Sequence, residues 1–112
     1  MKEIKAYIQN HKLQDVSEAL SHIDGLTGMS VLDCRGFGKG WGSAGAGSNA
    51  DSLGYRKHAK IEVFCSDDLA AAVITAIQQA AHTGLKGDGK IYVADISHAV
   101  RISTGETGES AV

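Results

Sequence analysis

The hydrophobic pattern of this chain switches between the period of a strand and the period of a helix, and it does so on both sides of one glycine-rich segment. In the first half, apolar residues alternate over residues 2–9, recur every three or four positions over 13–23, and return to a strand-like pattern over 29–34. Alternation predicts a strand with one buried face, and the wider spacing predicts an amphipathic helix. The first half therefore predicts a strand, a helix and a second strand, with Gly25 placed to end the helix.

The second half repeats this order. An alternating stretch covers residues 59–65, a helical stripe covers 70–81, and an apolar run follows over 91–96. Ser66 is a favourable N-cap residue for the second helix, and Gly84 is placed to end that helix. Two βαβ halves of this kind predict an α+β fold, a ferredoxin-like double βαβ sandwich in which one antiparallel sheet carries both helices on a single face.

The chain has 112 residues, of which 43% are hydrophobic, and this is enough for one compact domain over residues 1–112. A last short strand is predicted at residues 100–102, and the polar tail over 104–112 is expected to be mobile. The formal charge of −2 argues against nucleic-acid binding, which needs a positive excess to neutralise phosphates. No apolar run approaches a membrane span, so we expect a cytoplasmic protein without direct membrane insertion.

Cys34 and Cys65 are predicted to be free thiols. If the strands on either side of the glycine-rich segment pair around Gly47, the two cysteines lie several residues apart in register, too far for a disulfide bond. Two cysteines do not make a zinc motif, and the five histidines show no ligand spacing, so no metal site is predicted.

Half of the fourteen glycines lie between Gly36 and Gly54. At this density glycine makes the backbone entropically costly to order, and we expect a long flexible loop over residues 36–56. Trp41 is a single large aromatic residue among small ones, which suits an anchor that enters a pocket on a partner protein. The composition is also that of a flexible linker between the two halves, and composition alone does not decide between these readings.

A second glycine-rich stretch, at residues 83–93, has the features of a phosphate-binding loop. Gly87 and Gly89 leave backbone N–H groups uncovered and allow positive φ, so that successive amides can converge on an anion beside Lys90. The same residues also fit a tight turn between helix and strand, with Asp88 and Gly89 as the turn residues. Because the string lacks the longer spacing of a Walker loop, its assignment as a phosphate site depends on the other glycine-rich segment and on Arg101.

In their order and spacing, these motifs resemble the PII signal-transduction family, the trimeric nitrogen-status sensors of bacteria, archaea and plant plastids. The resemblance runs almost from end to end and is sharpest at residues 83–93 and at 100–106. Further matches are Met1-Lys2-Glu3-Ile4, Lys12-Leu13, and residues 26–31, 36–38 and 60–63. It implies a ferredoxin-like homotrimer that binds an adenine nucleotide in each cleft between subunits and presents the long loop, called the T-loop, to its partners.

The resemblance also implies which residues bind the nucleotide. The phosphate grip would be Gly87, Asp88, Gly89 and Lys90, completed by Arg101. Backbone amides with a lysine and an arginine suit a phosphate chain, because a guanidinium binds two phosphate oxygens at once. The opposite wall and the adenine contacts would come from Gly28, Met29, Ser30, Gly36, Phe37, Gly38, Lys39, Glu62, Val63 and Phe64.

The chain departs from the family pattern at three ligand-binding positions. Gly40 replaces a glutamine that helps to hold magnesium and 2-oxoglutarate, and His58 replaces a lysine that binds the 2-oxoglutarate carboxylate. Ser103 replaces an arginine that reaches the terminal phosphates, so preference is expected to move from ATP towards ADP or AMP. Lys39, Gly40, Lys57 and His58 form a candidate site for a second, smaller anion such as bicarbonate, to which a divergent, carboxysome-associated branch of the family responds.

We therefore predict a regulatory protein without enzymatic activity or cofactor. Binding of ADP, AMP or ATP would change the conformation of the T-loop, which would then dock on a membrane transporter or a metabolic enzyme. One alternative is a conventional nitrogen regulator that responds to ATP and 2-oxoglutarate. Others are a structural trimer with a vestigial cleft, and a slow nucleotide hydrolase that uses Lys90 and Arg101 with Glu62 or His58 as base.

Overall fold

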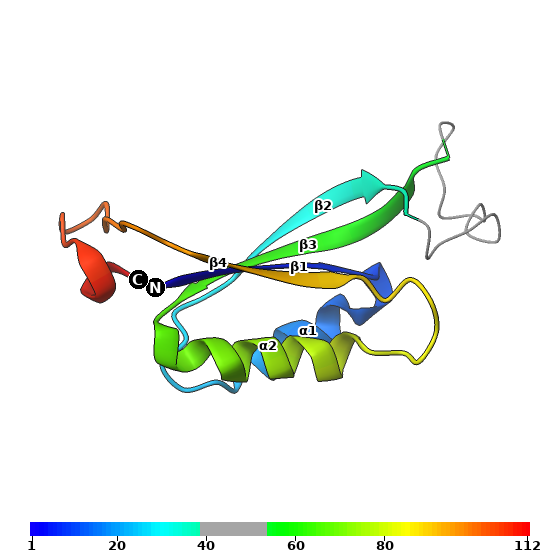
Figure 1. Cartoon of the computed structure of the whole chain (residues 1–112), viewed down its shortest axis with the longest axis horizontal. Coiled ribbons are helices and arrows are strands. Elements are labelled where there is room, and N and C mark those ends of the chain that lie inside the picture. Colours follow the sequence, from blue (N-terminus) through cyan, green and yellow to red (C-terminus); the bar gives the residue numbers. More distant parts are fainter. Residues whose placement is uncertain (39–53) are drawn as a thin grey trace.

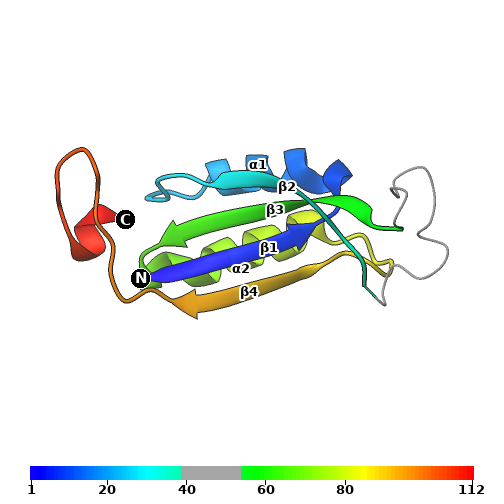
Figure 2. The same ribbon diagram turned by 90° about the horizontal axis from the view of Figure 1, so that it is seen from above.

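The fold is taken from a computed structural model, which describes residues 1–38 and 54–112. Two α-helices lie side by side on one face of an antiparallel sheet (Figure 1). The sheet order is β2-β3-β1-β4, which is also visible from above in Figure 2, and this order confirms the predicted ferredoxin-like fold. In chain order the elements are β1 (Lys2–Ile8), η1 (Asn10–Lys12), α1 (Leu13–Ser21), β2 (Ser30–Gly36), β3 (Arg56–Cys65), α2 (Asp67–Ala81), β4 (Lys90–Asp95) and η3 (Gly108–Ala111).

The core lies between the sheet and the two helices, and the alternation read from the sequence produces it. In β1 every second side chain is buried, from Ile4 through Ala6 to Ile8, and β3 continues the pattern with Ile61 and Val63. The register sets Ile4 opposite Val63 and Ala6 opposite Ile61, so that the buried sides of both strands coincide. Each large aliphatic side chain buried in this way stabilises the fold by about 1.5–3 kcal/mol. The helices complete the core with Val16, Leu20, Val73 and Ile77.

The ends of several elements differ from the predictions. The basic residues before Ala59 belong to β3, because pairing with β2 continues as far as Gly36 opposite Arg56. Ser66 makes no side-chain cap; instead its carbonyl accepts a hydrogen bond from the Leu69 N–H at 3.1 Å. Gly84 has φ of 85°, but α2 ends earlier, at Ala81, so this glycine turns the loop after the helix.

The strand predicted at residues 100–102 is wrong. Val100 makes only an isolated bridge to Thr107, and between them the Gly105 N–H donates to the Arg101 carbonyl at 2.8 Å, which closes a turn. The segment 104–112, expected to be a mobile tail, completes this turn and continues into the short helix η3. The apolar residues Val100 and Ile102 suggested a strand, but residues 1–38 and 54–112 contain no neighbouring strand for them to join.

Cys34 lies opposite His58 in the β2–β3 register, so the structure sets it well away from Cys65, as the predicted pairing requires. Burial raises the pKa of both thiols. In the part of the chain that the structure describes, no group of three His, Cys, Asp or Glu side chains is placed to hold a metal ion. The helices among these residues are too short or too polar to cross a membrane.

We expect Ile61→Ala to lower the free energy of unfolding by about 2–5 kcal/mol, because the Ile61 side chain is completely buried between sheet and helices. Ile102→Ala removes the same atoms from a fully exposed side chain and should change stability by less than about 0.5 kcal/mol. Urea denaturation of the two variants measures the difference. Equal losses would mean that Ile102 is buried in an assembly of several chains.

Candidate functional site

One carboxylate sets the shape of the loop between α2 and β4. Asp88 accepts hydrogen bonds from the Thr83 hydroxyl and, at 2.8 Å, from the Thr83 backbone N–H. The Thr83 hydroxyl accepts in turn from the Leu85 N–H at 3.1 Å. The hydrogen bond from the Thr83 hydroxyl, followed by that from its backbone N–H, holds the pKa of Asp88 below its ordinary value. The Asp88 carboxylate is thus engaged within the loop, which agrees with its alternative role as a turn residue, and its contact with a ligand stays a prediction.

The glycines of this loop have the conformation that the sequence predicts. Gly87 and Gly89 have φ of 90° and 100°, in the left-handed region. Gly89 also passes directly over β1, since a Cβ at this position would overlap the carbonyl oxygen of Tyr7. The Gln9 side chain donates a hydrogen bond to the Gly87 carbonyl at 3.0 Å. The loop is therefore fixed against the end of β1, with glycine required at Gly89 for two independent reasons.

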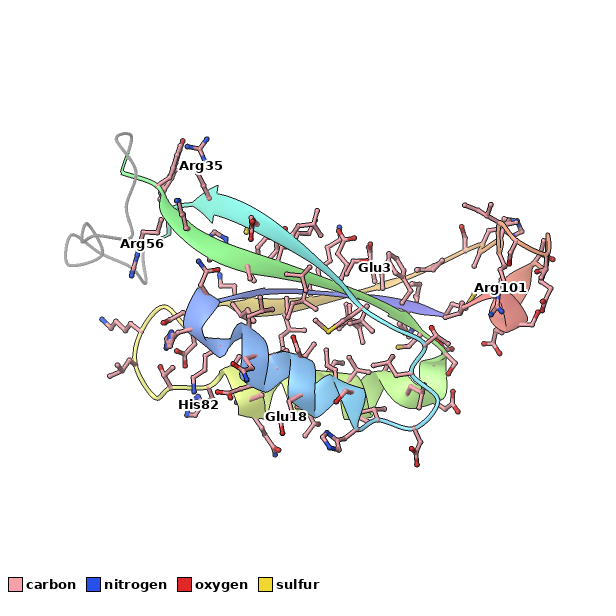
Figure 3. All side chains as sticks on the ribbon, turned by 180° about the vertical axis from the view of Figure 1, so that it is seen from behind. Glu3, Glu18, Arg35, Arg56, His82 and Arg101 are labelled. Atoms are coloured by element: carbon pink, nitrogen blue, oxygen red, sulfur yellow. The ribbon has the colours of Figure 1, made fainter. Side chains whose placement is uncertain are left out.

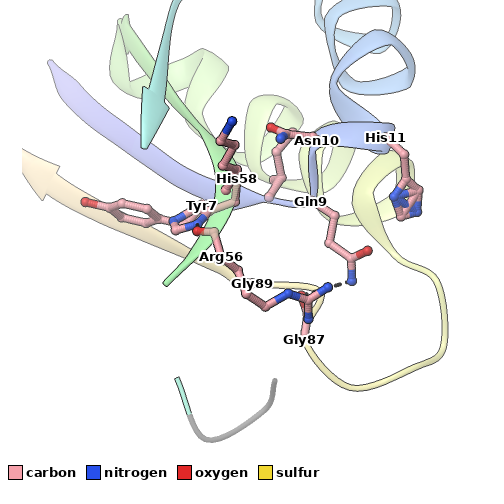
Figure 4. A pocket seen from close by; sticks show the side chains of 10 residues that line it. Tyr7, Gln9, Asn10, His11, Arg56, His58, Gly87 and Gly89 are labelled. Carbon is pink, nitrogen blue, oxygen red and sulfur yellow. Dashed lines mark hydrogen bonds between the residues drawn. The ribbon is translucent and has the colours of Figure 1, made fainter. Parts of the chain in front are cut away.

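A pocket of about 350 Å³ lies between this loop, the end of β1 and the start of β3 (Figure 4). This size is in the range of sites that bind small molecules. The His58 ring lies 6.0 Å from the Tyr7 ring, measured between centroids. None of the described lining residues is acidic and four carry basic or imidazole groups, so the pocket favours an anion. The lining residues are Tyr7, Ile8, Gln9, Asn10, His11, Arg56, Lys57, His58, Gly87 and Gly89.

The base of the long loop borders the same end of the molecule. The β2–β3 ladder ends with Gly36 opposite Arg56, and just beyond it the Phe37 and Tyr55 rings stack at 5.6 Å with an interplanar angle of 16°. Gly36 therefore lies opposite a residue that lines the pocket of the Gly87 loop, and a wall formed by Gly36, Phe37 and Gly38 stays a prediction. The predicted residues Lys39, Gly40 and Trp41 lie outside the described part of the chain.

A second hollow, of about 530 Å³, lies where β2 begins and β3 ends. It brings together Gly28, Met29, Ser30, Glu62 and Phe64, all of them predicted nucleotide-binding residues, beside the segment that carries Val100. The Glu62 carboxylate lies 2.8 Å from the Lys60 ammonium, and this contact lowers the pKa of Glu62. Val63 is also a predicted site residue, but its side chain is fully buried in the core, so only its backbone can face a ligand.

Arg101 and Ser103 belong to this second region. Figure 3 shows Arg101 at the opposite end of the molecule from Arg56, which lines the pocket beside Gly87. The Arg101 guanidinium donates a hydrogen bond to the Ser110 carbonyl at 3.3 Å. Lys90 stands at the start of β4 and Arg101 follows the end of that strand, so one chain does not bring the two cations together. The residues predicted to form one site fall into two separate halves.

The fold and this divided site define a small ferredoxin-like protein with a glycine loop suited to anions. The family model described as nitrogen regulatory protein P-II matches residues 1–106. The nitrogen regulatory protein P-II of Bradyrhizobium diazoefficiens is 43% identical over 113 residues, and the GlnK protein of Escherichia coli K12 is 42% identical, each alignment covering both chains completely. The chain belongs to the PII family of nitrogen regulatory proteins, as its motifs predict.

A solved structure supports the same assignment. The crystal structure of Arabidopsis thaliana PII bound to citrate matches with a TM-score of 0.81 and 34% sequence identity. The match covers 99% of this chain and 91% of the Arabidopsis chain. The family consists of regulatory signalling proteins, which agrees with the predicted function class.

We expect Gly89→Ala to destabilise the protein by roughly 3 kcal/mol or more, because positive φ and overlap with the Tyr7 carbonyl both oppose a side chain. Gly84→Ala is the matched control, since its φ of 85° is similar but the space around it is open. This control should lose only about 1–2 kcal/mol. Chemical denaturation measures both losses, and similar values would show that the loop does not press against β1.

We expect Asp88→Asn to lower the free energy of unfolding by about 1–2 kcal/mol at neutral pH, because the hydrogen bonds from Thr83 favour the charged carboxylate. The pKa of Asp88 is lower in the folded protein, so its contribution is complete above the ordinary value of 3.8 and is lost as pH falls through the folded value. Denaturation curves between neutral and strongly acidic pH test this. A difference between wild type and variant that stays constant over this range would contradict the assignment.

Proposed function

We propose that this protein is a non-enzymatic sensor that binds an adenine nucleotide in clefts formed between copies of the chain. The observation that carries the proposal is the separation of Lys90 and the Gly87 loop from Arg101, which lie at opposite ends of one chain (Figure 3). A second copy can bring its Arg101 end to the Lys90 end of the first. Contacts of this head-to-tail kind form a closed ring when the rotation closes, and the family resemblance implies a homotrimer.

The face of the sheet opposite the helices supports such an assembly. Leu32, Phe64 and Tyr92 on this face are each roughly half exposed, with relative exposures of 43%, 41% and 54%. They alternate with charged residues, among which Lys60 lies 2.8 Å from Glu62. Helices cover only one face of the sheet in the described chain, so a sheet with large apolar side chains on its second face is expected to be covered by other copies.

The two halves suit the two ends of a nucleotide. The Gly87 loop, with Lys90 beside it and a pocket without described acidic groups, is suited to phosphate. The second hollow, with Phe64, Met29 and the Glu62 carboxylate, is suited to a base and sugar. We propose ADP or AMP ahead of ATP, because Ser103 removes a positive charge from the Arg101 side. That the Arabidopsis neighbour was crystallised with citrate shows a polyanion bound to a related fold.

A second anion, bicarbonate, is proposed to bind near His58 and Lys57, which both border the pocket of the Gly87 loop. Lys39 and Gly40 would complete this site. In this proposal the protein is cytoplasmic, and the T-loop with Trp41 regulates a transporter or a metabolic enzyme in a carbon-assimilation setting.

The names of the relatives favour a second candidate, a conventional nitrogen regulator. We propose that in this case the protein would respond to ATP and 2-oxoglutarate. The hydrolase alternative has less support. Glu62, one of its candidate bases, is paired with the Lys60 ammonium at 2.8 Å. Binding without catalysis is therefore the function that the geometry favours.

Calorimetric titration with ATP, ADP and AMP, each with and without 2-oxoglutarate or bicarbonate, separates the candidates. We expect tighter binding of ADP or AMP than of ATP, with no effect of 2-oxoglutarate. Binding of magnesium-ATP that strengthens with 2-oxoglutarate would establish the conventional regulator instead. No heat with any nucleotide would leave a structural trimer with a vestigial cleft.

Mixed assemblies test whether the cleft lies between chains. Lys90→Ala and Arg101→Ala should each weaken ADP binding by roughly tenfold or more, because each removes a charged contact to phosphate. Co-expression of the two variants in equal amounts should restore tight binding to about one cleft in four, since a ring then contains clefts with both wild-type residues. A site within one chain would gain nothing from mixing, and the separately purified variants are the control.

A further inference from the structure

Arg56 is the first residue of β3, and its side chain reaches into the pocket of the Gly87 loop. Figure 4 shows the side chain extending from β3 across the pocket towards Gly87. The residue is partly buried, yet within the described part of the chain its guanidinium makes no ion pair or hydrogen bond. A partly buried cation without a counter-ion is unfavourable by itself, and a bound anion would compensate it.

Arg56 differs in its position from the other two arginines of the sequence. Arg35 stands on β2 opposite Lys57, is exposed, and borders a different hollow together with Asp33. Arg101 lies at the other end of the molecule (Figure 3). Arg56 is thus the arginine that shares a pocket with the glycines of the loop.

We propose that Arg56 determines nucleotide specificity by binding the second phosphate of ADP. This inference rests on the proposed nucleotide site and adds a residue to it. Gly87 and Gly89 line the pocket from the loop side, whereas Arg56 reaches into it from β3. In this proposal the loop binds the first phosphate and Arg56 binds the second, so ADP makes both contacts and AMP makes only the first.

The chemistry of arginine suits this role. Its planar guanidinium donates two parallel hydrogen bonds to phosphate oxygens and stays charged at every physiological pH. Arg56 then supplies in this pocket the charge that Ser103 does not supply from the Arg101 side. A site with this arrangement favours ADP over AMP. The charge lost at Ser103 predicts only that ADP or AMP binds more tightly than ATP, and does not distinguish ADP from AMP.

The test is the ratio of ADP to AMP affinity in the full-length protein, measured by calorimetry. Arg56→Leu should weaken ADP binding by roughly tenfold or more and change AMP binding by less than about threefold. Arg56→Lys keeps the charge but loses the bidentate hydrogen bonds to phosphate, so its ADP affinity should fall between those of wild type and Arg56→Leu. Arg35→Leu removes the same charge from the neighbouring strand and should leave ADP binding unchanged.

The remaining outcomes contradict the proposal in distinguishable ways. Unchanged ADP affinity in Arg56→Leu, or equal losses for ADP and AMP, would overturn the role of Arg56 while leaving the nucleotide site intact. An equal loss in Arg35→Leu would show a general effect of charge and would also overturn it. Failure of the wild-type protein to bind any nucleotide would instead refute the proposed function. Thermal unfolding of each variant identifies any that has lost its fold, and Arg56→Lys then still provides the test.

Discussion

The antiparallel pairing of β1 with both of its neighbours is the constraint on which the site depends. Because β3 and β4 both run opposite to β1, their first residues come together at the end where β1 finishes. Tyr7 pairs with Lys60 on one side and with Lys90 on the other. The pocket, the glycine loop and the base of the long hairpin therefore meet at one end of the sheet, although they come from three distant parts of the sequence. The same directions send Arg101 to the opposite end.

Much of this fold was predictable, because burial on one face of a strand leaves a period of two in the sequence. Ile4, Ala6 and Ile8 carry that signal in β1, and the same argument correctly located both helices. It failed at Val100 and Ile102, where the apolar residues are more than half exposed and no strand of the described residues is adjacent. Alternation of apolar residues indicates that one face of a segment could be buried, but it does not indicate whether a neighbouring strand is present to pair with that segment.

The residues proposed for the candidate site came from the sequence and stay a prediction, whereas their arrangement could not be predicted from it. Motifs located the glycine loop and Arg101, but a linear motif contains no information on which end of a sheet each part reaches. Asp88 was assigned either to the ligand or to a tight turn, but its hydrogen bonds with Thr83 are local and leave no periodic signal that identifies Thr83 as the partner. Arg56 was overlooked because strand ends are the least certain part of a sequence prediction, and it stands at the first position of β3.

The Asp88 to Thr83 hydrogen bonds have a further consequence for how a ligand would be received. They order the glycine loop before any ligand arrives, and the Gln9 contact and the close approach of Gly89 to β1 hold it there. When a ligand binds to a preorganised loop, little free energy is spent on ordering the protein, so more of the contact energy remains as affinity. A loop that is already ordered also changes little in conformation when a ligand binds. Any conformational response must therefore begin in parts of the site other than this loop.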